Sequence, residues 1–167
     1  MGVAGLICAL AGSVHSAPAP ATPLDDVGFA ALRAAVPQLA DGSGLALTQV
    51  EASNSPAGEP PVYFPSLENA SISHVSFTDR SGGAANGSSG HATGVATRLA
   101  GTTTSLTPGL AEIDVFEASD WLNRMLLNGG FLPRTPDTTL INHSWAGASG
   151  DAAQDVQLLM RADWLVA

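Results

Sequence analysis

A helix predicted over residues 91–101 constrains the fold of this chain more than any other stretch. Its apolar positions, 92, 95, 96, 99 and 100, fall on one face at the helical period. These side chains are small except for Val95 and Leu99, so we expect the helix to press closely against a sheet. Gly101 follows the last apolar residue, where a left-handed C-terminal conformation is expected. His91 stands in the first turn, and its simplest interpretation is a histidine that hydrogen-bonds nearby backbone.

Strands and helices alternate along the chain from residue 44 onward. Strands are expected at residues 45–50, 72–77, 111–116 and 138–142. Two later helices are predicted, one capped by Ser119 and one with Val156, Leu159, Met160 and Trp164 on a single face. Residues 165–167 resemble the start of another strand. This alternation predicts an α/β fold in which helices cover both faces of a parallel sheet.

Polar side chains follow three of the expected strands. Glu51 ends the first strand, His91 opens the helix after the second, and Asn142 and Ser144 end a later one. Functional groups in parallel sheets gather beyond the carboxyl ends of the strands, so we expect these groups to converge on one edge. The simplest interpretation of Glu51 alone is a solvated carboxylate at a strand end.

Composition narrows the function classes. The 167 residues suggest one domain of ordinary size, and the net charge is −9, with six arginines and no lysine. No basic patch is available to hold phosphates, so nucleic acid is not an expected partner. The four histidines show no metal-ligand spacing, and we expect neither a metal nor a cofactor.

The N-terminal residues resemble a targeting segment. An apolar run over residues 3–12 is too short to span a bilayer, and small residues follow it, so residues 1–19 are predicted to be a signal peptide. Residues 20–43 would then be a linker and a leading helix, followed by the main domain at 44–167. We expect a secreted or periplasmic protein without a membrane span. Cys8 lies in the apolar run, so the mature chain would contain no cysteine.

Two motifs resemble those of the subtilisin-like serine proteases, the subtilases. The stretch His91-Ala92-Thr93-Gly94-Val95-Ala96-Thr97-Arg98-Leu99-Ala100-Gly101 is similar to the family's His-Gly-Thr-His-Val-Ala-Gly motif and its closing Ala-Gly. The stretch Ile141-Asn142-His143-Ser144-Trp145-Ala146-Gly147 resembles the family's Ile-Asn-Met-Ser-Leu-Gly. The resemblance covers roughly residues 40–167 and implies a subtilisin-like α/β fold and a polypeptide substrate.

The resemblance also implies roles for individual residues. His91 would be the general base, and Glu51 would orient it in place of the family's aspartate. Ser144, Trp145, Ala146 and Gly147 would line the substrate cleft. The family's first motif ends in Asp-Thr/Ser-Gly, whereas this strand ends in Glu51-Ala52-Ser53. Asp79 is an alternative, less favoured orienting acid.

Two further family motifs have no counterpart in these residues. The oxyanion-hole asparagine of an Ala-Gly-Asn segment and the nucleophile of a Gly-Thr-Ser-Met-Ala segment are both absent. We therefore expect an N-terminal portion of a catalytic domain that is inactive alone. One alternative is a non-catalytic module that binds peptides in the same cleft. Another is an unrelated α/β esterase with Ser144 as its nucleophile, although Ser144 lacks the Gly-X-Ser-X-Gly elbow of that fold.

Overall fold

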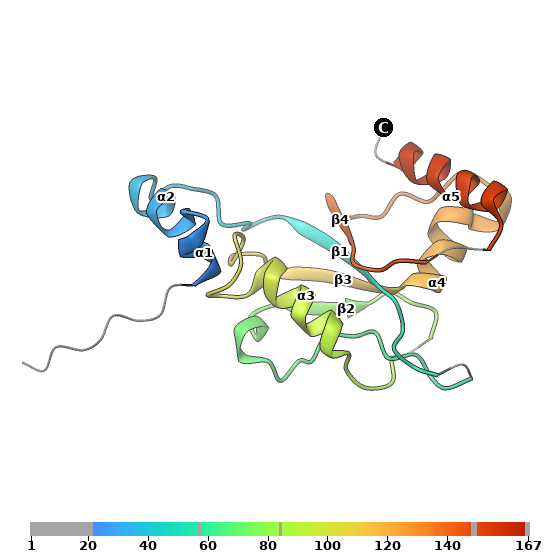
Figure 1. The fold of residues 1–167 in the computed structure, drawn as a ribbon, viewed down its shortest axis with the longest axis horizontal. Helices are drawn as coiled ribbons and strands as arrows, with labels where there is room; N and C mark the ends of the chain where they lie inside the picture. Colours follow the sequence, from blue (N-terminus) through green and yellow to red (C-terminus); the bar gives the residue numbers. More distant parts are fainter. Residues whose placement is uncertain (1–21, 57, 84, 148–149, 166–167) are drawn as a thin grey trace, which may run out of the picture.

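The computed structural model describes residues 22–56, 58–83, 85–147 and 150–165, and four parallel strands form one sheet in this part of the chain. The strands are β1 (Ala46–Glu51), β2 (Ser76–Asp79), β3 (Glu112–Glu117) and β4 (Leu140–His143). Their order across the sheet is β2-β3-β1-β4, and every pairing is parallel (Figure 1). The predicted α/β class with a parallel sheet is confirmed. The central strand β1 has partners on both sides.

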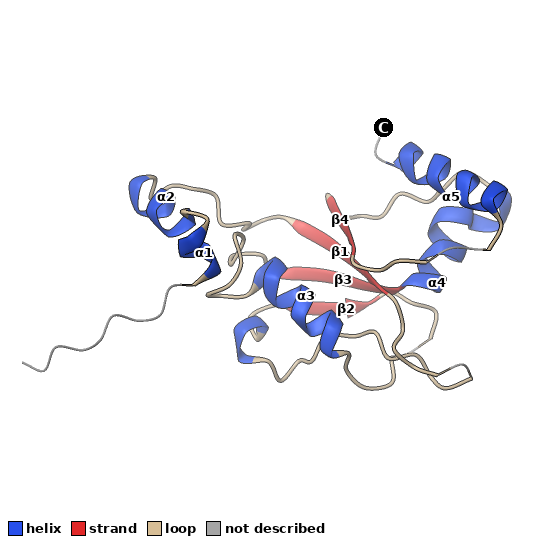
Figure 2. Ribbon diagram, in the orientation of Figure 1, coloured by secondary structure: helices blue, strands red, loops and turns tan. Residues whose placement is uncertain are grey.

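The helical segments surround this sheet. In chain order they are α1 (Pro23–Asp26), α2 (Phe29–Ala35), the 3-10 turn η1 (Ala70–Ile72), α3 (Gly90–Ala100), α4 (Ala118–Trp121), the π-helical η2 (Leu122–Leu127), the 3-10 turn η3 (Asn128–Gly130) and α5 (Ala152–Leu165). Figure 2 shows α3 crossing in front of the strands, α4 and α5 at one end of the sheet, and α1 and α2 at the other. No helix in the described ranges is long and apolar enough to cross a membrane.

The face of the sheet under α3 is closely packed. Leu47 of β1 joins Ile113 and Val115 of β3 in one core cluster, together with Ala96 and Ala100 of α3. All three helix alanines that face the sheet are completely buried, including Ala92. The expected close approach of a small-residue helix to the sheet is confirmed.

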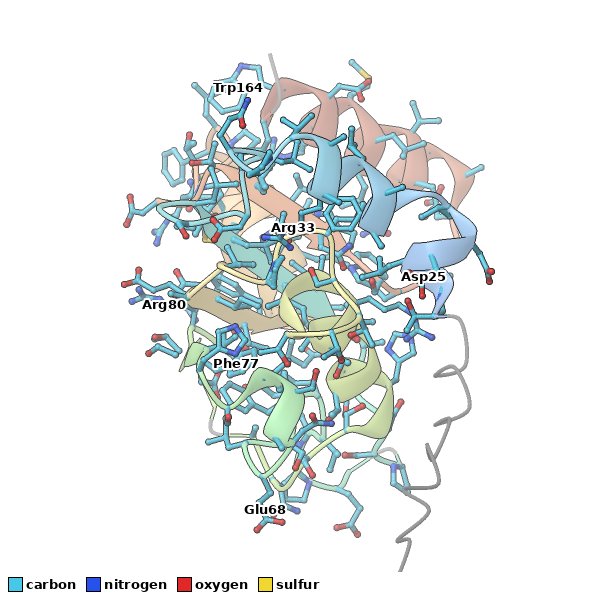
Figure 3. The ribbon with its side chains drawn as sticks, turned by 90° about the vertical axis from the view of Figure 1, so that its left-hand side faces the viewer. Asp25, Arg33, Glu68, Phe77, Arg80 and Trp164 are labelled. Carbon is cyan, nitrogen blue, oxygen red and sulfur yellow. The ribbon has the colours of Figure 1, made fainter. Side chains whose placement is uncertain are left out.

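A second core lies on the opposite face of the same strands. Val50 and Phe116 alternate with the residues under α3, as strand geometry requires, and they pack with Trp121 and Leu126 of α4 and η2. Residues Leu158, Ala162 and Leu165 of α5 complete this cluster only in part, because none of them is buried. Figure 3 shows Trp164 of α5 and Glu68, in the loop before η1, at opposite ends of the molecule.

Gly101 is needed for a different reason from the one predicted. Its φ is −59° and its ψ is 135°, so the left-handed conformation expected at this position is wrong. A Cβ at Gly101 would lie 2.3 Å from the Thr97 carbonyl oxygen and 2.5 Å from the Thr104 hydroxyl. A glycine stands there because the last turn of its own helix, the turn that follows and the Ser71 hydroxyl leave no room for a Cβ.

The second predicted strand begins four residues late. Asn69 Oδ1 accepts a hydrogen bond from Ser71 N, and this cap starts the 3-10 turn that places Ile72 in the core. Regular pairing starts only at Ser76, whose N–H donates to the Ala111 carbonyl at 2.8 Å. The last strand is also shifted, because β4 runs to His143 rather than ending at Asn142.

The predictions for the last two helices need correction. Glu117, not Ser119, caps α4, because β3 runs straight into the helix and the last strand residue accepts from Asp120 N at 2.9 Å. Leu165 ends α5 and is not in a strand, while residues 166 and 167 lie outside the described part. The predicted signal peptide also lies outside it.

The apolar face predicted for α5 points to solvent. Arg161 donates to the backbone carbonyls of Leu126, Leu127 and Phe131, and these bonds fix the rotation of the helix. Leu158 and Ala162 therefore face the second core cluster. The predicted set lies outside, with exposures of 54% for Val156, 67% for Leu159 and Met160, and 47% for Trp164.

Candidate active site

A carboxylate and an imidazole meet at the carboxyl end of the central strand. Glu51 is the last residue of β1, and His91 is the second residue of α3. Glu51 Oε2 lies 2.8 Å from His91 Nδ1, although 40 residues separate the two along the chain. The Glu51 side chain is 1% exposed and the His91 side chain is 57% exposed. The two residues that the sequence analysis proposed as a pair are thus in contact.

The partner of Nδ1 determines which ring nitrogen of His91 is available. A carboxylate oxygen only accepts hydrogen bonds, so Nδ1 must carry a hydrogen and donate it to Glu51. In the neutral ring, Nε2 then holds the lone pair, and no described residue hydrogen-bonds to it. Because more than half of the ring is exposed, Nε2 is a base that a molecule from solvent can reach.

Two polar side chains that the sequence analysis did not single out support the pair, one by direct contact with Glu51 and one through the cap of α3. Gln49 Nε2 donates to the second Glu51 oxygen, Oε1, at 2.8 Å and to the Ala92 carbonyl at 3.0 Å. Asn54, in the loop after β1, donates to the hydroxyl of Ser89, which caps α3. The available signal for Gln49 was a glutamine between Leu47 and Val50 of a predicted strand.

Asp79 is engaged elsewhere. Both of its carboxylate oxygens accept from the Tyr63 hydroxyl at 2.7 Å, and it also accepts from the backbone N–H of Ser81 at 3.0 Å and of Ala85 at 3.3 Å. Burial raises the pKa of the Tyr63 hydroxyl, which therefore stays a donor to Asp79. Asp79 holds the loop after β2, and Glu51 is the acid in contact with His91.

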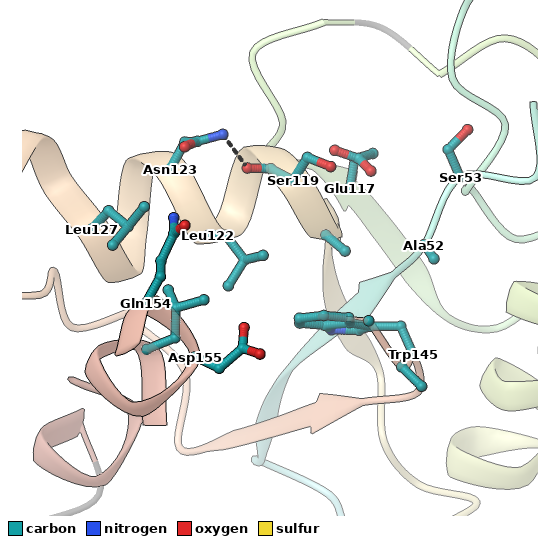
Figure 4. A pocket seen from close by; sticks show the side chains of 14 residues that line it. Ala52, Ser53, Glu117, Ser119, Leu122, Asn123, Leu127, Trp145, Gln154 and Asp155 are labelled. Atoms are coloured by element: carbon teal, nitrogen blue, oxygen red, sulfur yellow. Dashed lines mark hydrogen bonds between the residues drawn. The ribbon is translucent and has the colours of Figure 1, made fainter. Parts of the chain in front are cut away.

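An open groove of about 510 Å³ begins at the two residues that follow Glu51 in the chain. Ala52 and Ser53, which directly follow Glu51, line one end, and Trp145, Ala146 and Gly147 line one side. Figure 4 shows the Trp145 indole in this groove, with Leu122 of η2 and Asp155 of α5 across from it. Three of the four residues predicted to line a cleft therefore line this one.

Ser144, the fourth predicted cleft residue, is not among those that line the groove. Its hydroxyl donates to Asn142 Oδ1 at 2.5 Å, because residues two apart in an extended segment point to the same side. No hydrogen bond joins Ser144 to His91 in the described part of the chain. Asn142 and Ser144 thus bond to each other and not to the Glu51–His91 pair.

Aromatic rings build the wall behind Trp145. Trp145 Nε1 donates to His143 Nδ1 at 3.1 Å, and the His143 ring meets Trp121 edge-on with the centroids 4.4 Å apart. The partial burial of the His143 ring lowers its pKa, which favours the neutral form that accepts this bond. The ring stack fixes the orientation of the indole in the groove.

Comparison of the chain with protein-family models, with curated proteins and with solved structures finds no match. In the described ranges, no three His, Cys, Asp or Glu side chains cluster in a way that could hold a metal ion.

Proposed function

We propose that this chain carries the acid–base half of a serine-type endopeptidase of the subtilisin-like kind. The observation that carries the proposal is the 2.8 Å contact between a fully buried glutamate and an exposed histidine at the carboxyl end of the central parallel strand. The motif resemblance around His91 and Ile141 supports the same assignment. We also propose that the protein acts outside the cytoplasm, on the basis of its N-terminal apolar run.

The pair is suited to general base catalysis. His91 Nε2 would take the proton from a serine hydroxyl as the oxygen attacks a peptide carbonyl, and would then return it to the leaving amine. Glu51 would hold the ring in the tautomer with hydrogen on Nδ1 and would stabilise the imidazolium that forms. A buried carboxylate suits this role because water cannot compete for its oxygens.

The groove supplies a place for an extended polypeptide. Its Trp145 side, with the small residues Ala146 and Gly147, would receive apolar side chains of the substrate. Burial of apolar surface against an indole is a common source of binding energy for peptides.

No described serine hydroxyl is hydrogen-bonded to His91. Ser144 is bonded to Asn142 and not to His91, which argues against the esterase alternative. The serine would have to come from a segment outside the described residues. A non-catalytic peptide-binding module remains the second candidate, because the groove is present without a serine bonded to the histidine.

The test uses the product of the longest open reading frame that contains this chain. We expect hydrolysis of an extended chromogenic peptide, and we expect His91→Ala to lower kcat/KM by roughly 10²–10⁴-fold or more. His74→Ala, at an exposed histidine, is the matched control and should leave the rate unchanged. A loss of only a few-fold in His91→Ala would refute the assignment.

A fluorophosphonate probe separates the candidates in the same experiment. Labelling of a serine outside the residues described here supports the peptidase, and labelling of Ser144 supports the esterase. Binding of the peptide without labelling or hydrolysis supports the binding module.

A further inference from the structure

Gln49 is a buried polar residue in the middle of the central strand. Side chains alternate along β1, so Leu47, Gln49 and Glu51 share the face under α3. Gln49 is completely buried, and its neighbour at the same level of β3 is Val115, which belongs to the core. A buried amide is unfavourable unless its polar atoms are paired, so an apolar residue would be the simpler choice here.

The orientation of the Gln49 amide follows from its partners. Its nitrogen donates to Glu51 Oε1 at 2.8 Å and to the Ala92 carbonyl at 3.0 Å. Both partners only accept, so the nitrogen must face them, and a flipped amide would set oxygen against oxygen at both contacts. The bonds join the acid on β1 to the first turn of the helix that carries His91.

The Gln49 amide oxygen, unlike the nitrogen, is not hydrogen-bonded. It is buried and has no hydrogen-bond partner in the described part of the chain. The residue therefore carries an unsatisfied acceptor while both hydrogens of the amide are directed at the site. The unpaired oxygen lowers the stability of the fold, whereas the donated bond holds the Glu51 carboxylate in place.

Glutamate at this position needs such support. Its carboxylate turns about three side-chain bonds, one more than that of an aspartate, and the last of these torsions is broad. The bond to His91 holds only Oε2. Rotation about the last side-chain bond of Glu51 could then still move Oε1. A donor on Oε1 fixes the plane of the carboxylate and with it the direction from Oε2 to Nδ1.

We propose that Gln49 is the positioning residue of the Glu51–His91 pair. It fixes the glutamate carboxylate against α3, so that Nδ1 of His91 keeps its hydrogen and Nε2 remains the free base. This inference rests on the proposed function for its catalytic consequence. Its structural part, the control of the His91 tautomer, stands independently.

The first test is nuclear magnetic resonance on this chain. Gln49→Met keeps the approximate size of the side chain and removes both donors. We expect the downfield Nδ1–H resonance of His91 to broaden or disappear, and the ring ¹⁵N shifts to report a mixture of tautomers. Thr48→Val is the matched control, because Thr48 is also fully buried and polar but faces the opposite core, where it bonds Thr138. It should leave the His91 signals unchanged.

A second measurement decides the matter if Gln49→Met does not fold. In the unaltered chain labelled with ¹⁵N-glutamine, one Gln49 amide hydrogen should be shifted downfield by the Glu51 carboxylate, unlike those of the exposed Gln154. Ordinary shifts for both Gln49 hydrogens, or an unchanged His91 tautomer in a folded Gln49→Met variant, overturn the proposal.

The catalytic consequence is measured on the open reading frame product. Gln49→Met should lower kcat by roughly 10- to 100-fold with little change in KM, because misplacing a catalytic group by a fraction of an ångström has effects of this size. If His91→Ala abolishes activity while Gln49→Met changes neither kcat nor the tautomer, the positioning role of Gln49 is wrong and the peptidase stands. If no activity exists but the tautomer changes, the positioning role stands and the peptidase is wrong.

Discussion

Helices α3 and α5 pack against different core clusters, and they do so in different ways. The α3 side is closed, because Ala92, Ala96 and Ala100 are fully buried and leave no gap between helix and strands. The α5 side is open, because no residue of that helix is buried and a groove lies between it, η2 and Trp145. The acid–base pair is built on the closed side and the groove on the open side. Catalytic geometry needs rigid support, whereas a substrate needs access.

The largest expected effect is on the closed side, at Glu51. Glu51→Gln keeps the shape but can present its NH₂ to Nδ1, which forces the wrong tautomer on His91. We expect kcat/KM of the open reading frame product to fall by up to about 10⁴-fold. Glu112→Gln, at the exposed start of β3, is the control and should have no effect. An active Glu51→Gln enzyme would remove the triad from consideration.

Glu51→Asp sharpens the same test. The shorter side chain cannot hold Gln49 and His91 at their present distances of 2.8 Å, so this variant should also lose most of its activity. Full activity in Glu51→Asp would show that the carboxylate position is less constrained than we infer.

The next largest expected effect is on the free energy of unfolding, through the packing of α3 on the closed side. Ala96→Leu adds three carbons where the helix touches the sheet, and overpacking of this kind costs about 3 kcal/mol of unfolding free energy. The same change on α5, Ala153→Leu, lies at an exposed position and should change stability by less than about 0.5 kcal/mol. Urea unfolding measures both, and equal effects would contradict the difference between the two sides.

A smaller effect is expected at the open side. Trp145→Ala removes the indole from the groove and should raise KM for an extended peptide about 10-fold, a loss of about 1.4 kcal/mol of binding, with little change in kcat. Trp164→Ala is the matched control, because Trp164 is exposed on α5 and is not among the residues that line the groove. A KM that rises equally in both variants would mean that the groove does not bind the peptide.

The smallest effect is a pH dependence from His143. Its folded pKa is lowered by burial, so the fold favours the neutral ring, and the contribution to stability is complete above the ordinary pKa of about 6.5. That contribution is lost as the pH falls through the lowered folded value, when Nδ1 is protonated and the Trp145 bond breaks. The melting temperature should therefore fall less between pH 7 and pH 5 in His143→Asn, which keeps an acceptor, than in the unaltered chain. An identical fall would contradict this assignment.

The sequence was most informative where one strong local signal decided the structure. The apolar residues of β1 and β3 and the small-residue face of α3 predicted the closed side. The Glu51–His91 pairing was predicted from the positions of the two residues at the carboxyl ends of parallel strands and from the subtilase resemblance. The sequence was misleading on the open side. Helix α5 carries two apolar faces, and hydropathy alone cannot tell which of them packs against the core. The choice is made by the bonds from Arg161 to three carbonyls of the preceding segment. Gln49 was missed because a single polar residue in a strand has no periodicity to mark it.

The parallel order of the sheet also has a consequence for synthesis of the protein. The central strand β1 is made before both of its neighbours, and about 60 residues separate its end from the start of β3. At 5–20 residues per second, the ribosome needs roughly 3–12 s to supply that partner. During this interval β1 has no hydrogen-bond partner on either edge, so a nascent chain of this topology depends on protection from other chains before its sheet can close.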